Sequence, residues 1–154
     1  MTFRLSGLPA EPFAALFRAS NQELAALGAL RCTADSDSSF PCRISLTDAC
    51  KGDEVILTHY EHHAVSSPFR ASHAIYVRPG EQRFDAIGQI PPMLRSRLLS
   101  VRAFDRGAML VDADVGPGSD LQPLIERLFG DQRVSYLHVH FARPGCYAAR
   151  VDRA

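Results

Sequence analysis

Apolar and polar residues alternate on both sides of a turn signal in the segment Leu98–Val115. Because successive side chains of a strand point to opposite faces, this alternation predicts a β-hairpin with one apolar and one polar face. The sequence Phe104–Ala108 fits a three-residue loop in which Gly107 takes the left-handed position. That register places Arg102 diagonal to Asp112 on the polar face, within reach of an ion pair. The apolar face, which we expect in the core, holds Leu99, Val101, Ala103, Met109, Val111 and Ala113.

Short runs of β-favouring residues continue along the chain, separated by turn-forming residues. The expected strands are Phe3–Ser6, Arg43–Leu46, Glu54–Tyr60, Ser72–Arg78, Leu98–Phe104, Ala108–Val115, Val134–Phe141 and Cys146–Val151. The expected helices are Glu11–Arg18, Asn21–Leu27 behind a Ser20/Glu23 capping box, Pro91–Arg97, and Asp120–Phe129 with Ser119 as N-cap. We therefore predict a single α+β domain over residues 1–154, with a largely antiparallel sheet and a few short helices packed on one side.

The charge balance and the hydropathy exclude several classes of partner. The 17 basic residues equal the 17 acidic ones, and non-specific nucleic-acid binding needs a basic excess, so no nucleic-acid partner is expected. No apolar run approaches the ~18 residues that span a bilayer, so no membrane partner is expected either. The first residues lack the apolar stretch of a signal peptide, which indicates a cytoplasmic protein. Its four cysteines have no Cys-x-x-Cys spacing, and we expect them to be reduced.

The segment Tyr136–Tyr147 holds the densest group of reactive side chains. In a strand, His138 and His140 point to the same face, and the apolar residues that alternate with them point to the other. Two imidazoles on one face can chelate a metal, share a proton or hold an anion. A catalytic zinc ion takes three protein ligands and keeps one open position. The pair therefore makes a divalent metal such as zinc a candidate cofactor if a distant residue supplies the third ligand.

The third ligand must come from the remaining histidines, and the candidates are His59, His62 and His73. His59 follows the alternation of its strand and is expected to point inward, and His73 is expected to do so in the next strand. His62 lies beyond the expected end of its strand, on a loop. His59 is therefore our first choice and His73 our second. Hydrogen-bonded structural histidines and a metal-free ligand pocket remain alternatives.

Two Cys/Arg pairs are further candidates for chemistry. Cys146 follows the turn that begins at Arg143, and a cationic neighbour could activate its thiol as a nucleophile. An even number of residues in this turn puts Cys146 on the face opposite the two histidines, and an odd number puts all three together. Cys42 and Arg43 form the second pair. Arg43 could bind a carboxylate or phosphate, or form a structural salt bridge with Asp48.

Several blocks of the sequence resemble one known family. They are Phe40–Ala49, Ser67–Phe69, Leu99–Asp105, Val111–Ala113 and His138–Arg150, of which Pro41-Cys42-Arg43 and Gly145-Cys146-Tyr147 are the most specific. Together they resemble the bacterial family catalogued as domain of unknown function 1203. The resemblance implies a small, cytoplasmic, single-domain bacterial protein. It implies no activity, cofactor or catalytic residue.

Two functions from different classes follow from these patterns. The first is a small-ligand-binding or enzymatic domain with one pocket, formed by His138, His140, Arg143, Cys146, Cys42 and Arg43. Its partner is a small molecule. The second is a non-catalytic interaction domain, a homodimer in which the same residues serve packing and turn geometry. A concave pocket lined by these polar groups favours the first function, and dispersed side chains favour the second.

Overall fold

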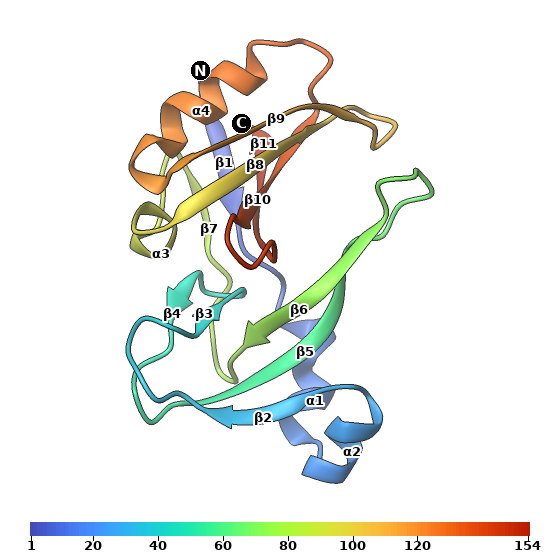
Figure 1. The fold of residues 1–154 in the computed structure, drawn as a ribbon, viewed down its shortest axis with the longest axis vertical. Coiled ribbons are helices and arrows are strands. Elements are labelled where there is room, and N and C mark those ends of the chain that lie inside the picture. Colours follow the sequence, from blue (N-terminus) through green and yellow to red (C-terminus); the bar gives the residue numbers. More distant parts are fainter.

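The computed structural model describes residues 1–154 and divides the strands between two sheets (Figure 1). In the six-stranded sheet the order is β7 (Asp85–Ile87), β1 (Phe3–Ser6), β11 (Tyr147–Arg153), β10 (Tyr136–Phe141), β8 (Leu98–Phe104) and β9 (Leu110–Pro117). In the five-stranded sheet it is β2 (Leu30–Thr33), β5 (Glu54–His63), β6 (Ala71–Val77), β3 (Pro41–Cys42) and β4 (Thr47–Asp48). Only β3 and β6 pair in parallel. The α+β class and the antiparallel character are confirmed.

The six-stranded sheet and helix α4 (Leu121–Phe129) enclose the largest apolar cluster. Leu121, Ile125 and Leu128 recur at helical spacing and bury one face of α4. Leu137 and Val139 of β10 pack in the same cluster. Burial of each such side chain contributes about 1.5–3 kcal/mol to the stability of the fold. The predicted N-cap of this helix is wrong. A 3-10 turn over Gly118–Asp120 precedes it, so the cap position moves to Asp120, which makes no side-chain capping bond.

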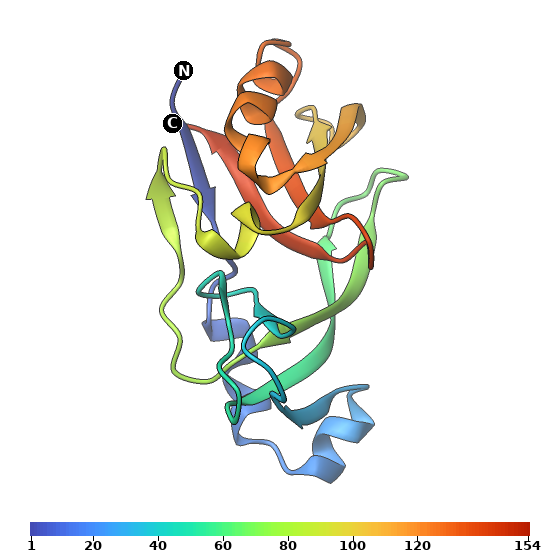
Figure 2. The ribbon, with the colours of Figure 1, turned by 60° about the vertical axis from the view of Figure 1, so that its left-hand side comes forward.

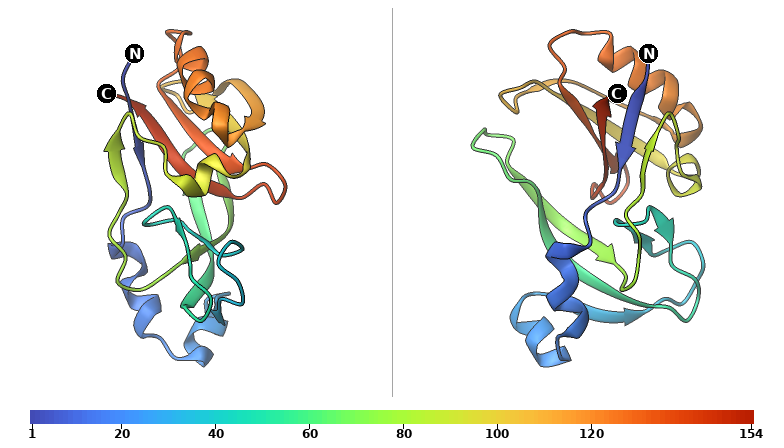
Figure 3. Two further views of the ribbon diagram at one scale, coloured as in Figure 1. Left: turned by 90° about the vertical axis from the view of Figure 1, so that its left-hand side faces the viewer. Right: turned by 180° about the vertical axis from the view of Figure 1, so that it is seen from behind.

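The five-stranded sheet has a smaller apolar cluster of its own, covered by α1 (Ala14–Arg18) and α2 (Asn21–Ala26) (Figure 2). The capping box at α2 is confirmed. The Glu23 amide donates to the Ser20 hydroxyl at 3.1 Å, and the Ser20 amide donates to the Glu23 carboxylate at 2.6 Å. Tyr147 of the other sheet packs into this cluster. The two sheets therefore share a boundary, visible from behind in Figure 3, rather than lying apart.

The boundary between the sheets is also crossed at the tips of two hairpins. The β5–β6 hairpin extends toward the β8–β9 hairpin (Figure 1). There the Ser67 hydroxyl donates to the Ala108 carbonyl at 2.7 Å and accepts from the Phe69 amide at 3.1 Å. These bonds fix the β5–β6 tip against the six-stranded sheet. The short helix α3 (Pro92–Arg95) leads into β8 at the opposite end of that strand.

The predicted register of the β8–β9 hairpin is wrong by three residues over most of its length. The loop lies one residue further along the chain, which moves the pairing by two residues, and a bulge moves it by one more. Ala108, with a φ of 59°, takes the left-handed position instead of Gly107, and the Asp105 carboxylate accepts the amides of Gly107 and Met109. As a result Ala103 pairs with Asp112, and Met109 is 43% exposed. The bulge lies between Ala103 and Phe104.

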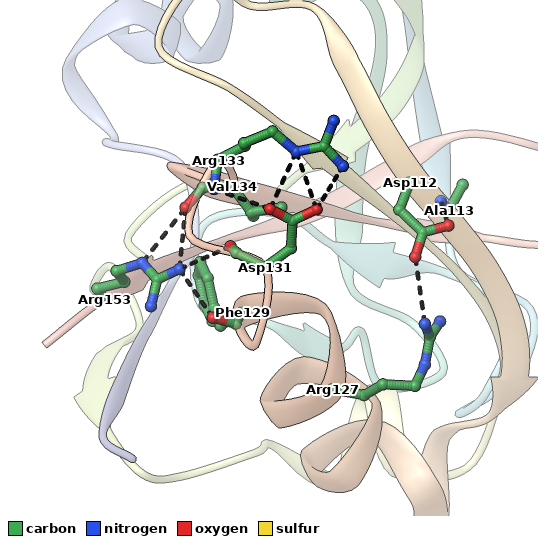
Figure 4. A network of polar contacts seen from close by, with 8 residues as sticks. All are labelled: Asp112, Ala113, Arg127, Phe129, Asp131, Arg133, Val134 and Arg153. Carbon is green, nitrogen blue, oxygen red and sulfur yellow. Dashed lines mark hydrogen bonds and ion pairs between the residues drawn. The ribbon is translucent and has the colours of Figure 1, made fainter.

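The shifted register sends Asp112 to the α4 side of the sheet, so it forms no ion pair with Arg102. Arg127 of α4 binds Asp112 at 3.1 Å (Figure 4) and Asp114 at 2.8 Å. Figure 4 also shows Arg153 donating to the Phe129 carbonyl at the end of α4. All three ion-paired side chains are about half exposed, so each pair contributes at most about 1 kcal/mol.

Smaller differences from the prediction concern the short strands. The expected strand Arg43–Leu46 is a turn, and its neighbours form the two-residue strands β3 and β4. Strands β2 and β7 were not predicted.

None of the helices has the length and apolar character needed to cross a bilayer.

Candidate metal centre

Strand β10 presents His138 and His140 on one face, as the alternation predicts. Leu137 and Val139 point into the large apolar cluster, so the two imidazoles point away from it, toward the boundary between the sheets. Both are nearly inaccessible, with exposed fractions of 2% and 1%. Arg102 of β8 is paired with His138 across the strands, so its side chain emerges on the same face.

The third histidine of the cluster is His62, rather than His59 or His73. Strand β5 runs to His63, so His62 lies in a strand and not on a loop. At even spacing from Ile56 and Tyr60, it emerges on the face of β5 that packs against Tyr147. A bulge between Tyr60 and His63 brings His63 to this face as well. His59 is exposed, contrary to the inward orientation predicted for it.

The nitrogen atoms that His62, His138 and His140 can offer to a metal all lie within 4.8 Å of one another. The ring centroids of His62 and His140 are 5.1 Å apart, and those of His62 and His138 are 6.1 Å apart. Ligands of a tetrahedral zinc ion, at about 2.0–2.1 Å from the metal, stand about 3.3 Å from each other. Small rotations of the three side chains would therefore close the site around an ion.

The hydrogen bonds of the three imidazoles leave ligating atoms free. The His140 Nδ1 lies 3.0 Å from the Gly145 carbonyl oxygen, which accepts its proton and leaves the Nε2 lone pair unused. The Nδ1 atoms of His138 and His62 are buried without any hydrogen-bond partner. A buried polar atom without a partner costs about 1–3 kcal/mol. A metal ion would satisfy such atoms.

All three imidazoles are held in the neutral state that a metal requires. Burial lowers the pKa of His138 to about 2, and the neighbouring His63 adds to this effect. Burial lowers the pKa of His140 to about 3 and that of His62 to about 4, with the Arg102 charge contributing to both. The lone pairs are therefore not blocked by protons at neutral pH.

His63 stands beside the cluster but has no free nitrogen. Its Nδ1 lies 2.8 Å from the Phe69 carbonyl oxygen, and its Nε2 lies 2.6 Å from the Tyr136 hydroxyl. Since the carbonyl can only accept, Nδ1 carries the proton and Tyr136 donates to Nε2. His63 is thus fixed in one tautomer and packs its ring 4.4 Å from that of Phe104. It supports the wall of the site rather than serving as a ligand.

A cavity of about 350 Å³ opens beside the cluster. It is lined by His62, His63, His138, His140, Arg70, Arg102, Pro68, Phe69, Ala71, Phe104 and Leu110. None of these residues carries a carboxylate. Arg70 is neutralised by Glu61 at 2.8 Å, outside the lining. Arg102 has no charged partner, and burial lowers its pKa.

The Cys/Arg residues lie in a different place, so the single pocket predicted from the sequence is wrong. The Phe141 amide donates to the Cys146 carbonyl at 2.9 Å and closes a four-residue turn in which Gly145 has a φ of 82°. The even turn puts Cys146 on the face opposite His138 and His140. There, Cys146, Arg43 and Arg143 line a second, larger cavity of about 850 Å³ together with His73.

Arg43 is held by neutral acceptors and not by Asp48. Its exposed fraction is 1%, and its guanidinium donates to the carbonyls of Tyr147 and Pro41 and to the Cys146 sulfur at 3.0 Å. Asp48 pairs instead with Arg97, which donates to both carboxylate oxygens at 2.6 and 3.0 Å.

Cys42 lies in neither cavity. It is buried in a third apolar cluster with Ala34, Ala49 and Val55. Burial raises the pKa of its thiol to about 12. None of the four cysteines forms a disulfide.

A comparison with protein families matches residues 39–153 to one model, described as "Protein of unknown function (DUF1203)". The chain belongs to this family. The match confirms the resemblance seen in the Pro41-Cys42-Arg43 and Gly145-Cys146-Tyr147 blocks. In this DUF1203 chain, the three histidines and Arg102 all lie within the matched range. A search of curated proteins and a search of solved structures found no match.

The sequence carried only part of the signal for this site. The alternation in β10 identified His138 and His140. His62 was one of three candidates, but it ranked below the others because the strand was expected to end at Tyr60 and leave His62 on a loop. Arg102 was correctly assigned to a polar face. Its place beside the histidines required the pairing of β8 with β10, between residues far apart in the chain.

Proposed function

We propose that this protein binds a divalent metal ion such as zinc through His62, His138 and His140 and uses it on a small molecule in the adjoining cavity. One observation carries the proposal: three neutral imidazoles from two sheets converge within 4.8 Å, and two of them have a buried nitrogen without a partner. Structural histidines normally have their buried nitrogens hydrogen-bonded, as His63 does. That contrast supports a ligating role for the cluster.

The composition of the site favours catalysis over a purely structural metal. Structural zinc sites have four protein ligands, and catalytic ones have three and an open position. Here three histidines converge, and they also line the 350 Å³ cavity, so an open position would face a space for substrate. An ion with three histidine ligands lowers the pKa of a bound water to about 7 and polarises carbonyl or phosphoryl oxygens. We therefore infer a metal-assisted hydrolysis or hydration.

The surrounding residues would hold the ligands in place. The Gly145 carbonyl accepts the Nδ1 proton of His140 and so fixes its tautomer, as carbonyls bonded to ligating histidines do in metal sites. The Tyr147 ring stacks on His62 with a centroid separation of 5.0 Å and an angle of 12°. Phe104 and Tyr136 pack around His138. Such packing limits the motion of the imidazoles and lowers the entropy cost of binding an ion.

Metal analysis of the untagged protein, purified without chelator, tests the proposal. We expect about one equivalent of zinc or a related ion per chain, and a tetrahedral visible spectrum after reloading with cobalt(II). The substitutions His62→Phe and His140→Phe should each abolish stoichiometric binding. His59→Phe is the matched control, because this residue lies in the same strand as His62 and is exposed. It should bind the metal normally.

The outcomes separate the proposal from its competitors. A metal content near zero in folded protein, with no uptake of added zinc or cobalt, would remove the metal centre. Equal uptake by the wild type and by His62→Phe would place the metal elsewhere. Either result would leave a metal-free ligand pocket or the non-catalytic interaction domain as the explanation of the buried histidines.

A further inference from the structure

We infer that the 350 Å³ cavity binds a small organic oxyanion, a carboxylate or a phosphate ester, whose charge pairs with Arg102. Its apolar body would lie against Phe69, Phe104 and Leu110. The assignment of this anion as a substrate rests on the proposed function; its binding at Arg102 does not.

The first argument is the charge balance of the cavity. Its lining contains two arginines and no carboxylate. Arg70 is already neutralised by Glu61. The positive charge of Arg102 is therefore not compensated by any group in the cavity.

The second argument is the way in which Arg102 is placed. Its side chain is part-buried and stands beside His138 on the neighbouring strand. The nearby acidic residues are occupied elsewhere: Asp112 and Asp114 bind Arg127 on the other face of the sheet, and Asp152 binds Arg150. The Arg102 guanidinium thus keeps its donors for a ligand. Its planar fork matches the two oxygens of a carboxylate or phosphate.

The third argument is the shape of the rest of the cavity. Phe69, Phe104 and Leu110 make one wall apolar, and Pro68 extends it. The Ser67 bonds between the hairpin tips hold this wall to the six-stranded sheet. The volume of about 350 Å³ is at the lower end of the range for small-ligand sites. The cavity therefore suits a molecule with one anionic group and a compact apolar body.

Calorimetric titration with three probes tests the inference on both metal-free and cobalt-loaded protein. The probes are benzoate, phenyl phosphate and neutral benzyl alcohol. Comparing the first two distinguishes carboxylate from phosphate ligands. We expect at least one of the two anions to bind and benzyl alcohol to bind much more weakly.

Three variants assign the binding to a residue. Arg102→Met keeps the side-chain stem but removes the charge, and it should weaken the preferred anion roughly tenfold to a hundredfold. Arg102→Lys should recover part of this loss. Arg70→Met is the matched control, because it removes a cation that lines the same cavity but is already paired. It should change the affinity less than about threefold.

The outcomes for the anion and for the metal are independent. Anion binding that depends on Arg102 in a protein that takes up no metal would support this inference and remove the proposed function. Normal metal uptake together with equal anion affinity in the wild type and Arg102→Met would overturn the inference alone. Absence of anion binding in both forms of the wild type would also overturn it.

Discussion

Acidification of the metal-free protein should destabilise it through His138 and His140. Both have a folded-state pKa far below the value of about 6.5 expected in an unfolded chain, about 2 for His138 and about 3 for His140. The unfolded state therefore binds protons at a pH where the folded state does not. The stability is fully present above about pH 6.5 and is lost as the pH falls toward the folded-state values.

The size of this effect follows from the two pKa differences. A pH of 5 lies about 1.5 units below the pKa of a histidine in the unfolded chain. Protonation of each such histidine therefore stabilises the unfolded state by about 2 kcal/mol. His138 and His140 together would then remove about 4 kcal/mol between pH 8 and pH 5. Total stabilities are about 5–15 kcal/mol, so the change is a large fraction of what holds the fold. His62, with a folded-state pKa of about 4, also stays neutral in the folded protein at pH 5 and adds a loss of similar size.

Urea unfolding followed by circular dichroism, in the presence of a chelator, measures this loss at pH 8, 6.5 and 5. His138→Phe replaces an imidazole whose Nδ1 has no partner, so it should fold normally and reduce the loss by about 2 kcal/mol. His59→Phe, at an exposed position, should leave the loss unchanged. If His138→Phe loses as much stability as the wild type between pH 8 and pH 5, the buried histidine is not the group that titrates.

Three further substitutions or probes test the packing. Gly118→Ala should lower the free energy of unfolding, followed by a thermal melt, by at least about 3 kcal/mol, because its Cβ would lie 1.8 Å from a backbone oxygen of α3. Gly116→Ala is the control, since its Cβ would meet nothing within 4 Å, and it should change the stability little. Arg43→Lys should lower the free energy of unfolding by about 2–4 kcal/mol, since an ammonium cannot reach three acceptors as the guanidinium does; an unchanged urea midpoint would contradict this. A thiol reagent should label exposed Cys50 in the native protein and Cys42 only after unfolding, because burial raises the pKa of Cys42 to about 12; rapid native labelling of Cys42 would show the burial to be wrong.

Features that depend on residues close together in the sequence were predicted correctly. The alternation in β10 placed Leu137 and Val139 in the core and put His138 and His140 on the opposite face. The capping box at Ser20 marked the start of α2. Each of these depends on residues within a few positions of one another, where propensity and periodicity act directly.

Features that depend on a local exception were missed. Ala108 occupies a left-handed position that the sequence assigned to Gly107, because the Asp105 carboxylate holds the loop one residue further on. The bulge before His63 has the same character: one unpaired stretch of strand reverses which side chains face inward. In β9 a further bulge moved Asp112 to the other face of the sheet, and in β5 the bulge brought His63 to the face of Tyr60.

Features that depend on distant pairing could not be predicted at all. Arg43 finds its acceptors in Tyr147 and Cys146, more than a hundred positions along the chain. The division of the strands between two sheets decided which side chains meet at the histidine cavity, since His62 comes from one sheet and His138, His140 and Arg102 come from the other. No local pattern specifies which strands share a sheet.

The three histidines come from two different sheets, so a bound ion would link the sheets mechanically. His62 belongs to the five-stranded sheet, and His138 and His140 belong to the six-stranded one. An ion bound by all three would cross-link the two sheets at their boundary, and its binding free energy would oppose any motion that separates them. Amide hydrogen exchange in β5 and β10 would then slow on metal binding, while the far edges at β2 and β7 keep their own rates of local opening.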